Sequence, residues 1–170
     1  MKKPRPLRRT ALILGVLFVL DLGYAGQGLF SLAVATGGVI LLLIGALAAV
    51  VRQRPEVAKT RLARAGIYLL LGAATLGMLR FHAFTAESHA AQIIDACRAF
   101  KDKNGAFPNT LQALVPEFLP GVPRAKYVMA FGDFSYWTSS PTAHTLMYTA
   151  LAPFGRRVYS LEAGSWSSID

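Results

Sequence analysis

The segment Leu29–Val51, LFSLAVATGGVILLLIGALAAVV, decides the fold class, because no charged residue occurs from Leu22 to Val51. A helix that crosses a bilayer needs roughly 20 predominantly apolar residues, and this segment supplies them. The whole chain of 170 residues is 54% hydrophobic and only 16% charged, whereas soluble domains carry roughly 25% charged residues. The composition therefore predicts an integral membrane protein.

Two weaker apolar segments flank this one. Ala11–Leu20 can be extended through Asp21 to give a first span. Ala65–Leu79 is short for a third span and crosses comfortably only if Arg80 snorkels to the interface or is paired. The sequence thus predicts an α-helical membrane bundle of three transmembrane helices within residues 1–84, at about 10–25, 29–51 and 62–84.

The basic residues predict the direction of these spans. Residues 1–84 contain eleven Lys or Arg and two acids, whereas residues 85–170 are electrically neutral. The basic residues gather before the first span and between the second and third, and positive flanks stay in the cytoplasm. We therefore predict a multi-pass protein of the bacterial inner membrane, with a cytoplasmic N-terminus and a periplasmic domain after Phe84. The high pI follows from this topology and gives no reason to expect a nucleic-acid partner.

The first span has a second interpretation. A basic N-terminus followed by Ala11–Leu20 and the small residues of Gly23-Tyr24-Ala25 is also typical of a cleavable secretory signal. Both alternatives stay open at the level of sequence, and both leave residues 85–170 outside.

Asp21 is the only acid near the predicted hydrocarbon layer, and Arg80 is predicted at the same outer interface. An ionisable residue at membrane depth usually has a partner or a function. We expect an intramembrane ion pair between Asp21 and Arg80 that fixes the first span against the third. No second acid continues a polar path through the spans, so an ion pathway is disfavoured.

Residues 85–170 read as a small α+β domain. Ala90, Ile93 and Cys97 recur on one face of a helix over Glu87–Lys103, which predicts that the single cysteine is buried. No helix breaker occurs from Leu62 onward, so the third span is expected to continue into this helix until Asn104-Gly105. Strands are predicted at Tyr127–Phe131, Phe134–Ser139, Thr145–Leu151 and Arg157–Leu161, with turns at Gly132-Asp133, Pro141 and Pro153-Phe154-Gly155. The expected fold is a long helix packed on a three- to four-stranded antiparallel sheet.

A short helix is predicted between the long helix and the strands. Asn109 is placed to cap it, and Leu111, Leu114 and Val115 would form its buried side. Pro116 limits it. The segment from Phe100 to Pro123, FKDKNGAFPNTLQALVPEFLPGVP, resembles the major pseudopilin of type II secretion and other pilin-like proteins. The resemblance covers about residues 87–170 and implies a pilin-like fold.

The chain also departs from that family. Prepilins begin with one cleavable membrane helix, whereas two further spans precede the helix here. The acidic glycine-rich loop that binds calcium in the pseudopilin is represented only by Ser160–Gly164, with Glu162 as its one carboxylate. Filament assembly, peptidase processing and calcium are therefore not carried over.

No arrangement of residues predicts catalysis. His82 and His89 lack partners for a metal shell and are interpreted as interface and surface residues, and His144 is placed in a loop. Ser165, Ser167 and Ser168 lie in a predicted tail without a nucleophile motif. We expect no catalytic residue, metal or cofactor, and no small-molecule substrate.

Aromatic residues are dense in the predicted strands. If the side chains alternate, one set faces the helix and the other faces outward, where it would offer a surface for a partner. The residues of this predicted interaction surface are Tyr136, Trp137, Tyr148, Tyr159 and Trp166. The sequence thus favours a non-enzymatic membrane protein that binds an envelope protein, accessory to a secretion or pilus-type system. The alternative is an immunity protein that protects against an envelope-directed toxin.

Overall fold

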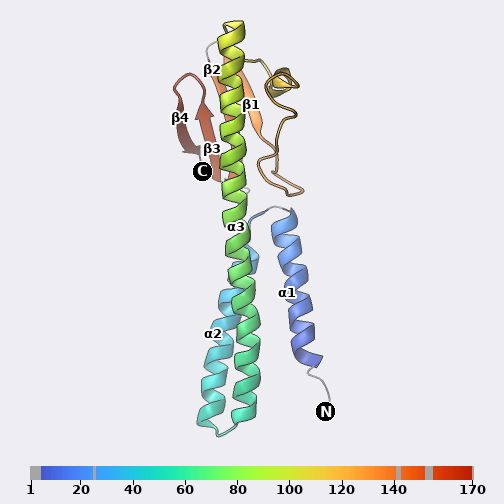
Figure 1. The fold of residues 1–170 in the computed structure, drawn as a ribbon. Helices are drawn as coiled ribbons and strands as arrows, with labels where there is room; N and C mark the ends of the chain where they lie inside the picture. The colour runs from blue at the N-terminus through green and yellow to red at the C-terminus, as the bar shows by residue number, and fades with distance from the viewer. Residues whose placement is uncertain (1–4, 25, 141–142, 152–154, 170) are drawn as a thin grey trace. The chain divides into compact units, whose positions relative to one another are not determined.

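The computed structural model describes residues 5–24, 26–140, 143–151 and 155–169. Contacts divide the chain into two compact units, Met1–Leu79 and Arg80–Asp170, which we call the N-terminal and the C-terminal unit. Several sequence features fall outside the described residues, namely Lys2, Lys3, Ala25, Pro141, Pro153 and Phe154. The elements along the chain (Figure 1) are α1 (Arg5–Tyr24), α2 (Leu29–Val51), α3 (Pro55–Asn104), η1 (Leu111–Leu114), β1 (Ser135–Ser140), β2 (Ala143–Leu151), β3 (Gly155–Ser160) and β4 (Ser165–Ile169).

Among the described residues, two helices, α2 and α3, are long and apolar enough to span a membrane. Helix α2 coincides with the second predicted span. Helix α1 is not a candidate, because Arg8, Arg9 and Asp21 fall within its 20 residues. The structure therefore gives two candidate spans where the sequence predicted three.

The N-terminal unit has a small interior and an apolar exterior. Leu14, Ala35 and Leu71, one from each of its helices, form a buried cluster. Ile13, Leu41 and Leu70 are about 70% exposed. Soluble monomers rarely expose continuous apolar surface on this scale.

Helix α3 is one continuous element of 50 residues, as the absence of a breaker after Leu62 predicted. It ends where Gly105 adopts a positive φ of 81° and its N–H donates to the Lys101 carbonyl at 2.7 Å. This left-handed residue after the helix confirms the predicted stop. From Arg80 onward the helix belongs to the C-terminal unit.

The sheet of the C-terminal unit is an antiparallel meander in the order β1-β2-β3-β4. Strands β1, β2 and β3 lie close to three of the predicted strands. Strand β4 was missed, since Ser165–Ile169 had been interpreted as a tail.

The prediction of a strand at Tyr127–Phe131 was wrong. Phe131 has a φ of +60°, outside the extended region, and no residue of this segment pairs in the sheet. Instead the Lys126 N–H donates to the Gly132 carbonyl at 3.0 Å and closes a loop. A Cβ on Gly132 would lie 2.7 Å from the Lys126 carbonyl oxygen, so this close approach requires glycine.

The core of the C-terminal unit lies between α3 and the sheet. Ala90, Ile93 and Cys97 on the helix are completely buried, and Leu146 of β2 is buried in the same cluster. Small residues on the helix allow the sheet to approach closely. Leu111 and Leu114 of η1 cover one margin, and Thr110 rather than Asn109 precedes this short helix. The predicted α+β layout of a helix with an antiparallel sheet is confirmed.

Candidate functional site

The structure divides the predicted interaction surface. Tyr148 and Tyr159 are only 4% exposed and belong to the core, so the surface position predicted for them is corrected. Tyr136 is partly buried, and its hydroxyl donates to the Pro108 carbonyl at 2.7 Å. Burial of the ring raises the pKa of Tyr136, which keeps its phenol protonated as a donor. These three tyrosines therefore stabilise the unit from within.

Trp137 and Trp166 are exposed, and they lie on β1 and β4, the two edge strands of the sheet. The Trp166 ring packs on Tyr159 with centroids 5.0 Å apart, and the Arg157 guanidinium lies 5.4 Å from the Trp166 ring centroid. All five residues of β4 are exposed. An exposed edge strand presents unpaired backbone groups to which another chain can add a strand.

A cavity of about 330 Å³ opens beside Trp166. Its polar lining comes from Glu87 of α3 and from Arg157 of β3, whose Nε is buried without a hydrogen-bond partner among the described residues. Ala91, Ile94 and Tyr148 complete the wall. We call β4 together with this cavity the β4 face. Trp, Tyr and Arg are the residue types that contribute most to protein–protein binding.

Asp21 has a role that the sequence did not suggest. Its Oδ2 accepts a hydrogen bond of 2.8 Å from the Ser31 N–H, in the first turn of α2. That helix begins after Gly28, which has no side chain to cap it. Asp21 therefore supplies the acceptor of an N-cap from a neighbouring helix. Arg80 belongs to the other unit, so its ion pair with Asp21 stays a prediction.

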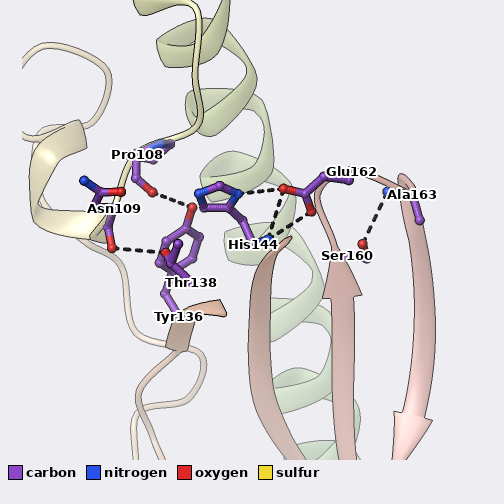
Figure 2. Close-up of polar contacts among 8 residues, drawn as sticks. All are labelled: Pro108, Asn109, Tyr136, Thr138, His144, Ser160, Glu162 and Ala163. Carbon is purple, nitrogen blue, oxygen red and sulfur yellow. Dashed lines mark hydrogen bonds and ion pairs between the residues drawn. The ribbon is translucent and has the colours of Figure 1, made fainter. Parts of the chain in front are cut away.

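His144, predicted to lie in a loop, is a buried residue of β2 (Figure 2). Its Nδ1 lies 2.6 Å from Glu162 Oε1, and its backbone N–H lies 3.0 Å from both carboxylate oxygens. The Phe107 ring packs on the imidazole with centroids 5.5 Å apart. The Leu161 N–H donates to the His144 carbonyl at 3.0 Å. This bond continues the pairing of β2 with β3 by one residue, and Glu162 is the next residue along the chain.

This pair binds the turn after β3 to the start of β2. Burial alone would raise the pKa of the Glu162 carboxyl, but hydrogen bonds from the His144 backbone and ring outweigh it, and the pKa lies below the usual 4.5. An ionised carboxylate accepts the Nδ1–H and so selects that tautomer. At 3% exposure His144 is closed to substrates, and no group of three metal-ligating side chains occurs among the described residues. The arrangement is structural.

We expect Glu162→Gln to lower the stability of the C-terminal unit at pH 6 more than at pH 3. A carboxyl whose pKa is lower in the folded state stabilises that state above about pH 4.5 and loses this contribution as the pH falls. Denaturation midpoints of the two proteins at both pH values measure the difference. The exposed Glu117 gives the control Glu117→Gln. A difference between wild type and Glu162→Gln that is equal at both pH values would contradict this assignment.

The two histidines of α3 differ. His82 is only 2% exposed. The prediction that it lies at an interface or on the surface was therefore wrong, and the residue is buried. His89 is half-buried, and its Nδ1 lies 2.6 Å from the Arg124 carbonyl oxygen. The His89 and Tyr127 rings meet edge to face, with centroids 6.2 Å apart. His89 thus holds the segment that follows η1 against the helix.

Cys97 is completely buried, which confirms its predicted place in the core. Burial raises the pKa of its thiol to about 12. Because the thiolate is the reactive form and the side chain is completely buried, the thiol is protected from reagents near pH 7. We expect the folded chain to resist maleimide labelling and the denatured chain to react completely, as measured by mass spectrometry. Ala163→Cys, at an exposed position, is the control that labels without denaturation.

Sequence reasoning missed the β4 face, the Asp21 cap and the His144–Glu162 pair, since each depends on residues distant along the chain.

Comparison with family models, with curated proteins and with solved structures found no match to this chain.

Proposed function

We propose that this protein is an integral membrane protein that presents its C-terminal unit outside the cytoplasm and acts there by binding an envelope protein. The observation that carries the proposal is helix α3, which supplies a candidate span and, from Arg80 onward, the core helix of an α+β unit. The apolar exterior of the N-terminal unit supports residence in lipid.

The proposed topology has three spans, the first provided by α1, and an orientation set by the positive flanks. Alkaline phosphatase fused after Asp170 should be active, since this enzyme matures only outside the cytoplasm. A fluorescent protein that matures only in the cytosol should be dark at the same position. The opposite pattern would refute the orientation, and release of the intact chain by alkali would refute membrane insertion.

We further propose that residues 87–170 form a pilin-like domain and that the protein is accessory to a secretion or pilus-type system. The proposal rests on the residues from Phe100 to Pro123 and on a helix-and-sheet layout. The outer edge of β4, beside Trp166, is one of the two edges of the sheet and offers a place where a partner can bind by strand addition.

Photo-crosslinking in cells tests the partner. A photoreactive residue at Ser168, on β4, should capture a specific protein, and Trp166→Ala should reduce that capture because it removes the aromatic anchor. The same probe at Asp102, an exposed residue of α3, is the matched control. Equal capture from both positions would refute the β4 face as the binding site, and capture of the chain itself alone would indicate self-association.

A further inference from the structure

Large apolar side chains are exposed together at one end of the C-terminal unit. Three come from the loop closed by Lys126 and Gly132, and two from the ends of β2 and β4. We call these residues the apolar rim: Tyr127, Met129, Phe131, Leu151 and Ile169, of which Met129 is the most exposed at 83%.

Backbone pairing and one buried lysine bring the rim together. Lys126, which is 3% exposed, reaches from the loop to β2, where its Nζ donates to the Ala150 carbonyl at 2.5 Å. Leu151 pairs with Gly155, and Ile169 pairs with Arg156. The last residues of β2 and β4 therefore lie at the same end of the sheet. The opposite end of the sheet carries the His144–Glu162 pair. In Figure 1 the chain runs from η1 along the sheet to the end that carries the rim before it enters β1.

The loop that carries the rim has a defined internal structure. The Arg124 side chain donates to Asp133 Oδ1 at 2.7 Å and to the Val128 carbonyl at 3.0 Å. Together with the bond between Lys126 and Gly132, these contacts hold the loop while its large apolar side chains face outward. Exposed apolar groups on an ordered loop indicate a surface that binds something apolar.

The rim lies beside the part of α3 that follows the predicted third span. His89 contacts both the Arg124 carbonyl and the Tyr127 ring. His89 is five residues beyond Phe84, the end of that span, which corresponds to about 7.5 Å along a helix. The polar layer on each side of the hydrocarbon core is roughly 5–8 Å thick. With the proposed end of the span at Phe84, the loop falls at the depth of the lipid headgroups.

We infer that the apolar rim rests in the outer headgroup layer of the bilayer and holds the C-terminal unit on the membrane surface. Tyr127, Met129 and Phe131 enter the boundary with the acyl chains, where amphipathic and aromatic side chains are favoured. Arg156, exposed beside Ile169, faces the lipid phosphates. This inference rests on the proposed membrane location and adds the lipid surface as a second partner of the unit.

The unreactive Cys97 makes a single-label test possible. Met129→Cys in the full chain is labelled with an environment-sensitive NBD fluorophore and reconstituted into phosphatidylcholine–phosphatidylglycerol vesicles. Some vesicles carry a nitroxide lipid with its spin label near the headgroup end of the acyl chain, at the depth expected for position 129. Others carry a nitroxide lipid with its spin label near the methyl end of the acyl chain, at the depth expected for position 41 in the middle of α2. We expect a blue-shifted emission that loses most of its intensity with the first of these nitroxide lipids. Ala163→Cys, at the opposite end of the unit, should show neither effect, and the unsubstituted chain gives the labelling background.

A label at Leu41→Cys, on the apolar exterior of α2, separates the two proposals. If Leu41→Cys is quenched and Met129→Cys is not, the N-terminal unit is in lipid and the rim inference alone is overturned. That result includes the case in which a second protein covers the rim. If neither label is quenched, the membrane location itself is overturned. Quenching at 41 and 129 but not at 163 supports both.

Discussion

Leu146→Ala is expected to lower the free energy of unfolding of the C-terminal unit by about 2–5 kcal/mol, the usual cost of removing a buried leucine side chain. Leu146 is completely buried at the centre of the sheet, in the cluster that includes Ile93 and Cys97 of α3. Its removal takes away apolar burial and leaves a cavity beneath the helix. The wall is formed by regular strands and a long helix, which relax little around such a cavity.

The chain contains two tryptophans, Trp137 and Trp166, and both lie on strands of this sheet. Denaturation of the full chain in detergent, followed by tryptophan fluorescence, therefore reports on the C-terminal unit. Leu151→Ala is the matched control, because Leu151 belongs to the same strand but is 43% exposed. It should cost less than about 0.5 kcal/mol, as surface substitutions usually do. Equal losses in both variants would show that Leu146 is not a core residue.

Gly38→Leu is expected to separate α2 from α3 within the N-terminal unit. A Cβ on Gly38 would lie 2.2 Å from an atom of the Tyr68 ring, far inside van der Waals contact. The ring must leave its place, and overpacking of this kind usually costs about 1–3 kcal/mol. Small residues at such contacts are how helices in lipid approach each other closely.

The neighbouring Gly37→Leu provides the control, since nothing lies within 4 Å of a Cβ at that position. Both substitutions change the intrinsic helix propensity equally, so their difference isolates the contact with Tyr68. Titration with sodium dodecyl sulfate, followed by energy transfer between donor and acceptor labels on α2 and α3, measures the midpoint at which the two helices separate. Gly38→Leu should shift this midpoint to lower detergent and Gly37→Leu should not. Identical midpoints would show that the two helices do not pack at Gly38.

The features predicted best from the sequence are those that a short stretch of residues determines. The bounds of α2 follow from an uncharged run between polar ends, and they agree with the predicted span residue for residue. The stop of α3 follows from a glycine able to adopt a positive φ. The first predicted span differs, because α1 carries Arg8, Arg9 and Asp21 within its 20 residues and is not a candidate span.

The errors in the C-terminal unit have physical causes. Tyr127, Met129 and Phe131 alternate with smaller residues as in a strand, but this alternation places large side chains on an exposed loop. Conversely, β4 has the polar sequence SWSSI and no apolar alternation. It is held by backbone bonds to β3 rather than by burial of its side chains. Periodicity reports burial, so it fails wherever a strand has none.

The His144–Glu162 pair was not predicted from the sequence, for a related reason. The two residues are 18 positions apart, and only the register of β2 with β3 brings them together. Asp21 and Ser31 are likewise joined by the packing of one helix end against another. Both contacts depend on how separate elements pack, which the local pattern of residues does not specify.

The order of elements along the chain has a consequence for biogenesis. The core helix of the C-terminal unit is synthesised before any strand of the sheet that covers it. Ribosomes add about 5–20 residues per second, so the 56 residues from Asn104 to Ser160 take roughly 3–11 s. During that interval Ile93 and its apolar neighbours on α3 lack the complete sheet that covers them. Local hairpins then pair quickly. The apolar core of the C-terminal unit is therefore completed only after the last strands of the sheet have been synthesised.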